Sequence, residues 1–340
     1  MTYYPFMKTR DAELRAYSKL SDQVKNLIIP IFELTKSRRT SIVPDGDIHR
    51  RMNYLEEIVG KRPFILDVTT VDKYSNPQTK DLLDETNGFY EWQYFLNKYD
   101  QLNIIPTIHI YNDEEYGEVE KFIRWASVKF DKLALRVPSY IDEISPILDM
   151  IVENIDDRCS LLLLIDAEFI PISEQDNAIE EIGRVIEEAS QIIEQNNIVI
   201  ITSTFPKIVA ELGEDHKGSF KIRELQIYNA LSDEYSVQYG DYASIHPLQY
   251  EMRGGTWVPR IDVSLAEDFI YTRYRRKDGG YIKAAEKMLN NREYVRFNCW
   301  GYEEIEKAAQ GDPGGKSPAY WISVRMNFHM SRRAKEFRNA

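Results

Sequence analysis

Short apolar runs rich in β-branched residues recur eight times along the chain, and amphipathic helical stretches separate most of them. Such runs are typical of strands buried on both faces of a parallel sheet, joined by right-handed helical crossovers. Eight βα units can close a (β/α)8 barrel, so an α/β, TIM-barrel-like fold is predicted. The runs span residues 27–34, 63–68, 104–110, 133–137, 161–167, 198–203, 235–239 and 269–274.

Helices are predicted over residues 117–127, 144–155 and 177–195, where apolar residues recur with helical spacing. A doubly wound open sheet is the main alternative, but that fold usually carries a glycine-rich first βα turn. The sequence contains neither GxGxxG nor GxxxxGK(S/T), which favours the barrel.

The last part of the chain has a different composition. A basic, glycine-bearing turn (RRKDGGY) is followed by helical stretches, the breaker GDPGGKSP and a final basic helix. We therefore predict a barrel over residues 1–275 and an α-rich C-terminal extension over residues 276–340. No long low-complexity linker separates them, so the extension is expected to pack on the barrel as part of the same domain.

Charge and cysteine content exclude several functions. The chain has 43 basic and 55 acidic residues, and this acidic balance argues against bulk binding of duplex nucleic acid. Cys159 and Cys299 lie far apart and away from any histidine at metal-ligand spacing, which predicts no zinc site. Charges interrupt the N-terminal segment and later apolar stretches are short, so a cytoplasmic protein without a membrane partner is expected.

One polar side chain falls near the C-terminal end of each of the first five runs: Glu33, Asp67, His109, Arg136 and Asp166. The C-terminal ends of barrel strands surround the mouth where active sites form. A charge inside an apolar strand is costly unless it reaches that mouth or a partner. These side chains are therefore expected to converge on one pocket.

The later runs continue the series. Ser203 ends the sixth run and Thr204 follows it, Asp241 follows the seventh, and Arg273 lies in the eighth. We expect these four residues to line the same pocket as ligand-binding groups.

The chemistry of this set favours metal-assisted phosphoester hydrolysis. Carboxylates are ligands suited to Mg²⁺, Mn²⁺ or Ca²⁺, a histidine is a candidate general acid or base, and arginines clamp phosphate. The candidate metal ligands are Glu33, Asp67 and Asp166, with His109 as the acid or base and Arg136 or Arg273 as the clamp.

Two other interpretations stay open. Glu33 and Asp166 are the available carboxylate pair for a glycosidase. Alternatively, Asp67 or Asp166 forms a closed ion pair with Arg136, and the ring is structural.

Several segments in a fixed order resemble the bacteriophage beta protein family across nearly the whole chain. They are the N-terminal segment with Tyr4, Pro5, Lys8, Arg10 and Glu13, the first run ending in Glu33, STFP (203–206), GDYASIHP (240–247), Tyr271 with Thr272, FNCWGYEEI around Trp300, and WISVRMNFH (321–329).

The resemblance implies a barrel-like fold and an association with phages or with bacterial loci that oppose them, without an established reaction. Members commonly carry adjacent histidines after an asparagine, whereas Phe328 separates Asn327 from His329 here. The family's GDYG loop reads GDYA, with Ala243 in place of glycine. The resemblance also suggests that the extension covers the barrel mouth. His246, Trp300 and His329 are therefore added as ligand-binding candidates.

The preferred function is therefore a metal-assisted phosphoester hydrolase or nucleotide-directed enzyme in a phage or phage-defence setting, with Mg²⁺ or Mn²⁺ and a phosphorylated ligand. The alternative is a recognition protein that binds a phage component, a nucleotide signal or a protein partner without turnover. Aromatic and arginine side chains, which are enriched in interfaces, motivate this alternative.

Overall fold

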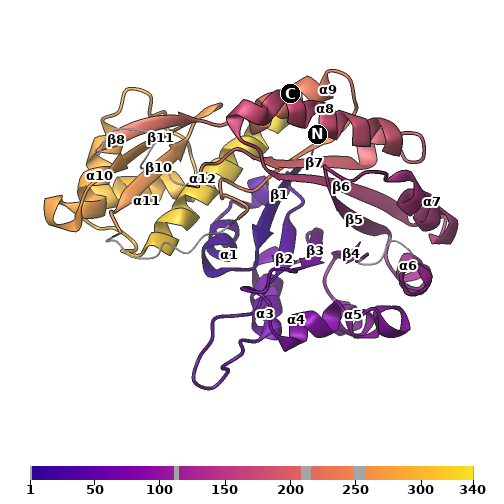
Figure 1. Cartoon of the computed structure of the whole chain (residues 1–340). Coiled ribbons are helices and arrows are strands. Elements are labelled where there is room, and N and C mark those ends of the chain that lie inside the picture. Colours follow the sequence, from indigo (N-terminus) through magenta and orange to yellow (C-terminus); the bar gives the residue numbers. More distant parts are fainter. Residues whose placement is uncertain (1, 111–114, 208–215, 249–256, 340) are drawn as a thin grey trace.

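The computed structural model describes residues 2–110, 115–207, 216–248 and 257–339 (Figure 1). Eight parallel strands close a barrel in the order β1-β2-β3-β4-β5-β6-β7-β9, which confirms the predicted (β/α)8-like fold. The strands are β1 (Tyr3–Lys8), β2 (Ile31–Leu34), β3 (Phe64–Val68), β4 (Ile104–Ile108), β5 (Lys132–Pro138), β6 (Ser160–Phe169), β7 (Ile198–Ser203) and β9 (Gln238–Asp241).

The prediction was wrong about which segment supplies the eighth strand. The N-terminal segment β1 pairs with both β2 and β9 and closes the barrel. Residues 269–274 instead lie largely in β11 (Asp268–Arg273), which pairs antiparallel with β10 (Arg260–Ser264) and β8 (Lys217–Lys221). The proline in β1 hid its strand character, because proline within a short run argues against a strand.

Helices surround the barrel as the crossovers require. The predicted helices over residues 117–127 and 144–155 match α6 (Gly117–Lys129) and α7 (Ser145–Asn154) within two residues. The one over residues 177–195 corresponds to α8 (Gln175–Ala189), which ends six residues earlier. The α-helices are α1 (Asp11–Ser18), α2 (Asp22–Lys25), α3 (Ile48–Val59), α4 (Pro77–Leu82), α5 (Thr86–Lys98), α6 (Gly117–Lys129), α7 (Ser145–Asn154), α8 (Gln175–Ala189), α9 (Glu224–Ser232), α10 (Gly280–Leu289), α11 (Trp300–Ala309) and α12 (Pro318–Asn339). Short 3₁₀ turns are η1 (Ile172–Glu174), η2 (Gln195–Asn197) and η3 (Arg276–Asp278).

A smaller layer lies beside the barrel (Figure 1). The three-stranded sheet, α10 and α11 share one apolar cluster, which includes Ile270, Tyr302 and Phe328. The long helix α12 belongs to both parts, because Phe328 packs in this cluster while Met330 and Phe337 pack in the main barrel core. Among the described helices, none has the length and apolar character needed to span a bilayer.

Strand alternation separates the barrel interior from the layer beneath the helices. Tyr4, Phe6, Ile31, Ile65 and Leu164 belong to the interior cluster, whereas their strand neighbours pack against the helices. Two residues further along these strands, toward the C-terminal ends, the interior positions become polar. That change marks the barrel mouth.

Candidate active site

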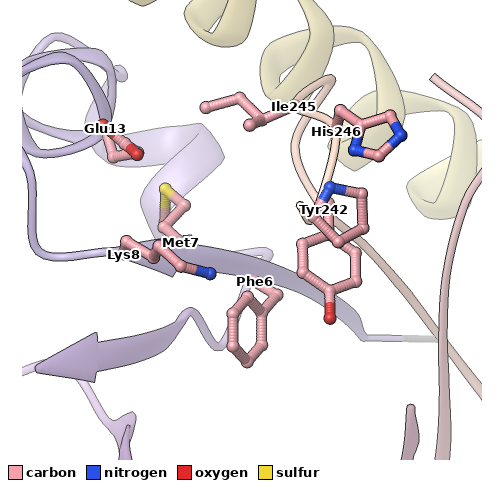
Figure 2. Close-up of a pocket in the computed structure, with 8 residues that line it drawn as sticks. Phe6, Met7, Lys8, Glu13, Tyr242, Ile245 and His246 are labelled. Atoms are coloured by element: carbon pink, nitrogen blue, oxygen red, sulfur yellow. The ribbon is translucent and has the colours of Figure 1, made fainter. Parts of the chain in front are cut away.

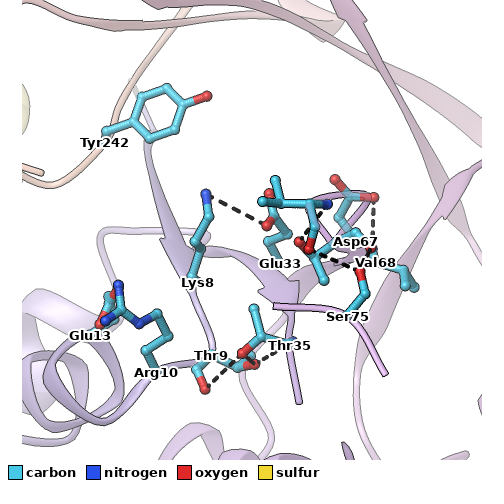
Figure 3. Close-up of polar contacts among 12 residues, drawn as sticks. Lys8, Thr9, Arg10, Glu13, Glu33, Thr35, Asp67, Val68, Ser75 and Tyr242 are labelled. Carbon is cyan, nitrogen blue, oxygen red and sulfur yellow. Dashed lines mark hydrogen bonds and ion pairs between the residues drawn. The ribbon is translucent and has the colours of Figure 1, made fainter. Parts of the chain in front are cut away.

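The polar positions at the mouth form a ring of side chains from several strands. Figure 3 shows Lys8, Glu33 and Asp67 among them. Lys8, Glu33, Asp67 and Asp166 follow interior residues by two positions on β1, β2, β3 and β6, so alternation turns them inward. The three carboxylates are buried, and the Lys8 side chain is 10% exposed. The structure therefore brings the three predicted carboxylates together and adds Lys8.

Arg136 is the centre of the ring. Its Nε lies 2.7 Å from Oδ2 of Asp67, Nη1 lies 3.0 Å from Oδ2 of Asp166, and Nη2 lies 3.9 Å from Oε2 of Glu33. The guanidinium also stacks over the ring of Phe6 at 5.2 Å. Burial opposes the charge of Arg136, but the three carboxylates outweigh it and raise its pKa well above the usual value. Arg136 is thus a permanent cation shared among three anions.

Lys8 supplies the second cation. Its Nζ lies 3.5 Å from Oε1 of Glu33 and 5.5 Å from the centre of the Phe6 ring. Sequence reasoning missed Lys8 because β1 was not recognised as a strand. The available signal was that Lys8, like the other ring residues, is a polar residue at the C-terminal end of a short segment, YYPFMK (Tyr3–Lys8).

His109 lies beside Asp67, with its Nδ1 4.0 Å from Oδ1 of that carboxylate. Trp92 and Phe89 contact its other faces at ring distances of 5.5 and 6.1 Å. Burial lowers the pKa of His109 to about 4, although the charge of Asp67 opposes the shift. Because His109 is buried and packs against both aromatic rings, it fits a packing role better than the predicted acid or base role.

Asp166 and Tyr242 contact each other at the mouth, where β6 and β9 lie on either side of β7. The Tyr242 hydroxyl donates to Asp166, with distances of 2.8 and 2.7 Å to Oδ1 and Oδ2. Burial and the Asp166 charge raise the pKa of Tyr242 well above its usual value, so the phenol stays protonated and remains a donor. Tyr242 was missed because Asp241, one position earlier, had been assigned to the ring.

Glu168 extends the ring toward solvent. The pairing of β6 with β7 shifts register between Asp166 and Phe169, and Glu168 within this bulge has a φ of 49°. The Glu168 amide donates to Oδ1 of Asp166 at 3.0 Å. Burial of the carboxyl group and the nearby Asp166 charge raise the pKa of Glu168, although the residue is exposed overall. Bulges and positive φ values concentrate next to functional sites, where they redirect side chains.

Asp241 and His329 lie outside the ring. Oδ2 of Asp241 is 2.8 Å from Nε2 of His329, and Tyr3 and Tyr239 donate to the same carboxylate. Nδ1 of His329 lies 3.0 Å from the hydroxyl of Ser264 in β10. Because successive strand residues point to opposite faces, Asp241 turns outward while Tyr242 turns inward. The contacts make this pair a link between the barrel, α12 and the side layer.

Three predicted residues form local contacts near the strand ends. Ser203 donates to the Ile245 carbonyl at 3.3 Å. Thr204 accepts from the Arg223 amide at 2.7 Å, which fixes the start of α9. His246 stacks on Phe169 at 4.4 Å and is partly buried.

Two predicted residues belong to the side layer instead. Arg273 ends β11, and its amide donates to the His216 carbonyl at 2.9 Å. Trp300 begins α11 and packs against Tyr320 at 5.8 Å. Their expected place at the mouth rested on an eighth barrel strand and a covering extension. Because β11 lies in the three-stranded sheet, that basis for Arg273 is lost.

The proposed metal ligands do not form a coordination group. Within the part of the chain that the structure describes, no cluster of three or more histidine, cysteine, aspartate or glutamate side chains could hold a metal ion. The physical reason is that Arg136 lies among Glu33, Asp67 and Asp166 and contacts an oxygen of each. The ring is arranged around a guanidinium.

The loop after β9 bears on the family comparison. Ala243 has a φ of 48° and Ser244 a φ of 68°, so both occupy the left-handed region. Glycine adopts this conformation at lower cost. The backbone of this loop therefore has the shape expected of the family's glycine although alanine occupies the position.

Comparison with known proteins confirms the resemblance inferred from the sequence. The chain is 28% identical to "Protein beta" of Enterobacteria phage P4 over 339 residues, covering 97% of this chain and 92% of that protein. Among solved structures, the spore cortex-lytic enzyme SleL of Bacillus megaterium QM B1551 matches 96% of this chain and 74% of that chain at 9% identity. The TM-score of this match is 0.39. The model of the Beta protein family matches residues 3–335, and the chain therefore belongs to the Beta protein family.

Proposed function

We propose that the barrel mouth is the active site of a hydrolase in which Asp166 and Glu168 divide the acid and base roles. The contrast between these two carboxylates on one strand carries the proposal. Asp166 is buried and held by Tyr242 and Arg136, whereas Glu168 reaches solvent on a strained bulge and has a raised pKa. Two carboxyl groups with different environments are the usual basis for separate acid and base roles.

The reaction follows from these environments. Asp166 accepts a proton from water as the water oxygen attacks the substrate, and Glu168 gives its proton to the leaving oxygen as that bond breaks. A proton passed from Asp166 to Glu168 through solvent restores the starting state. Arg136 and Tyr242 hold the Asp166 carboxylate in place during both steps, because each contacts its oxygens directly.

The charge of the ring bears on the substrate class. Four carboxylates (Glu33, Asp67, Asp166 and Glu168) accompany two cations, Lys8 and Arg136. A phosphoester or nucleotide, the substrate expected from the sequence, would bring further negative charge and could contact Lys8 and Arg136 only in competition with the carboxylates. A neutral polar substrate meets no such repulsion. We therefore propose a neutral polar substrate ahead of a phosphoester or nucleotide, in the same phage or phage-defence setting.

A substrate panel tests the proposal. It contains nucleotides, cyclic nucleotides, nucleic acids and oligosaccharides, each assayed with Mg²⁺, with Mn²⁺ and with EDTA. The variants Asp166→Asn and Glu168→Gln are expected to lower kcat by about 100-fold or more, because general acid–base catalysis contributes a factor of this order. Glu180→Gln, on the exposed surface of α8, is the matched control. Equal turnover by all four proteins would reject the assignment.

A recognition role without turnover is the second candidate, and the ion pairs of Arg136 favour it. A ring whose central cation already contacts three carboxylates is a satisfied network that can shape a binding surface. A pull-down from phage-infected cells tests this function with wild type and with Arg136→Met. A specific partner lost in the variant supports it, and an empty pull-down from wild type counts against it.

A further inference from the structure

A small pocket adjoins the ring between α1, the end of β1 and the loop after β9 (Figure 2). Lys8 and Tyr242 belong to both the ring and this pocket, so the ring and the pocket lie directly side by side. The lining is otherwise mostly apolar, with one buried carboxylate. The lining residues are Phe6, Met7, Lys8, Glu13, Tyr242, Ile245, His246 and Pro247.

Glu13 is the unusual member of this lining. Only 2% of the residue is exposed, and its carboxylate lies 4.0 Å from Nη1 of Arg10, beyond hydrogen-bond distance. Burial raises the pKa of Glu13, although Arg10, the residue's own backbone amide and Lys8 oppose the shift. A carboxylate offers about four acceptor sites, so these contacts leave Glu13 capacity to accept from a group that enters the pocket.

Lys8 supplies the complementary chemistry. Its ammonium carries three N–H donors, and its contact with Oε1 of Glu33 is a 3.5 Å ion pair. A group placed between Glu13 and Lys8 therefore meets an acceptor on one side and a donor on the other. A hydroxyl donates and accepts at once, whereas an ammonium would be repelled by Lys8 and a phosphate by Glu13.

The size of the pocket limits what enters it. Its enclosed space is about enough for one water-sized group, so one hydroxyl fits. The rest of the ligand would remain in the mouth, against Tyr242 and the ring carboxylates.

We infer that this pocket is a subsite for one hydroxyl group of a hydroxyl-rich substrate, with Glu13 as acceptor and Lys8 as donor. The inference rests on the proposed hydrolase and names its substrate class as a polyhydroxylated compound such as a sugar. Glu13 and Lys8 are specificity-determining residues, and Asp166 and Glu168 remain the reacting groups.

Binding of defined sugars tests the subsite. D-Glucose, N-acetyl-D-glucosamine and D-ribose are titrated into the full-length protein by NMR, with a matching deoxy sugar for each. At least one sugar is expected to bind, and Glu13→Leu is expected to weaken it about tenfold or more, as for loss of a hydrogen bond to a charged group. Glu57→Leu on the exposed face of α3 is the control.

Folding is followed by thermal unfolding of each variant. Glu13→Leu replaces a buried carboxylate with an apolar group of similar size. The contacts that it loses are those to the residue's own backbone amide and the 4.0 Å pair with Arg10, so its Tm should stay close to that of wild type. Glu13→Gln keeps the shape and an acceptor, and it should bind more tightly than Glu13→Leu. If none of the sugars binds, or if Glu13→Leu binds as wild type does, the subsite is rejected.

The subsite and the hydrolase can fail separately. Sugar binding that depends on Glu13, with no turnover of any panel substrate, supports the subsite and rejects the hydrolase. Turnover that requires Glu168 but has the same KM and kcat in Glu13→Leu rejects the subsite and keeps the hydrolase.

Discussion

The Tyr242 hydroxyl lies within 2.8 Å of both carboxylate oxygens of Asp166, and this contact joins the ends of β9 and β6, the two strands on either side of β7. Tyr242→Phe removes the donor while Arg136 still contacts the carboxylate. We expect the free energy of unfolding to fall by about 1.5 to 3 kcal/mol, the usual contribution of a hydrogen bond to a charged group. Urea denaturation measures it, with Tyr140→Phe at an exposed position as control. An equal midpoint for both variants would contradict the role of Tyr242.

Arg136 is expected to be the most costly residue of the ring to replace. Arg136→Met leaves Glu33, Asp67 and Asp166 buried without their shared cation, and loss of one partner from a buried ion pair costs about 3 to 5 kcal/mol. Arg158→Met is the comparison, because the Arg158 pair with Asp156 lies on the surface and such pairs contribute about 0 to 1 kcal/mol. Chemical denaturation of both variants checks this, and similar losses would show that the ring is not coupled through Arg136.

The low pKa of buried His109 predicts that mild acid lowers the stability of the fold. Its folded pKa of about 4 lies below the unfolded value near 6.5, so the unfolded state binds more protons between these pH values. Stability therefore falls as pH decreases through this window, by about 2 kcal/mol at pH 5. Urea midpoints of wild type and His109→Gln at pH 7.5, 6 and 5 measure the effect. The difference between the two proteins should change with pH, and parallel curves would contradict the buried neutral imidazole.

The sequence suggested that Asp241 and His329 bind ligand. Their contact in the structure predicts instead that they stabilise the fold. Burial opposes ionisation of Asp241, but His329 and the donor Tyr3 lower its pKa to about 2. This depressed pKa stabilises the fold above about pH 4, and the contribution is lost as pH falls toward 2. His329→Leu removes the main favourable charge, so acid unfolding should begin at a higher pH. Far-UV circular dichroism across an acid titration measures the pH at which unfolding begins. At pH 7, the variant and wild type should have the same ligand affinity at the mouth.

Alternation explains both the success and the errors of the site prediction. Glu33, Asp67, Arg136 and Asp166 were found because the strand ends of a barrel meet at one mouth and the runs could be aligned. Asp241 was placed in the ring although Tyr242 occupies it, since an error of one residue reverses the face of a strand. Arg273 was assigned from an apolar run that alternates equally well in an antiparallel sheet.

Other features of the site depend on tertiary contacts that local sequence patterns do not specify. Glu168 reaches the mouth through a bulge, and the DAE sequence around it has no local mark of a register shift. Glu13 lies on α1, and its burial follows from how that helix packs beside the loop after β9. Periodicity predicts which elements form, whereas the neighbours of a helix residue are set by the packing of distant segments.

The predicted boundary at residue 275 can be tested by truncation. The final helix α12 supplies Met330, Ala334 and Phe337 to the main barrel core, although it lies beyond that boundary. A chain that ends at residue 275 would expose the barrel surface that these side chains cover, so we expect it to aggregate or to lose cooperative unfolding. A chain that ends at Phe337 keeps all three residues and should unfold as wild type does. Thermal unfolding and size-exclusion chromatography distinguish the two. A stable, cooperative fragment of residues 1–275 would instead show that the extension is a separate domain.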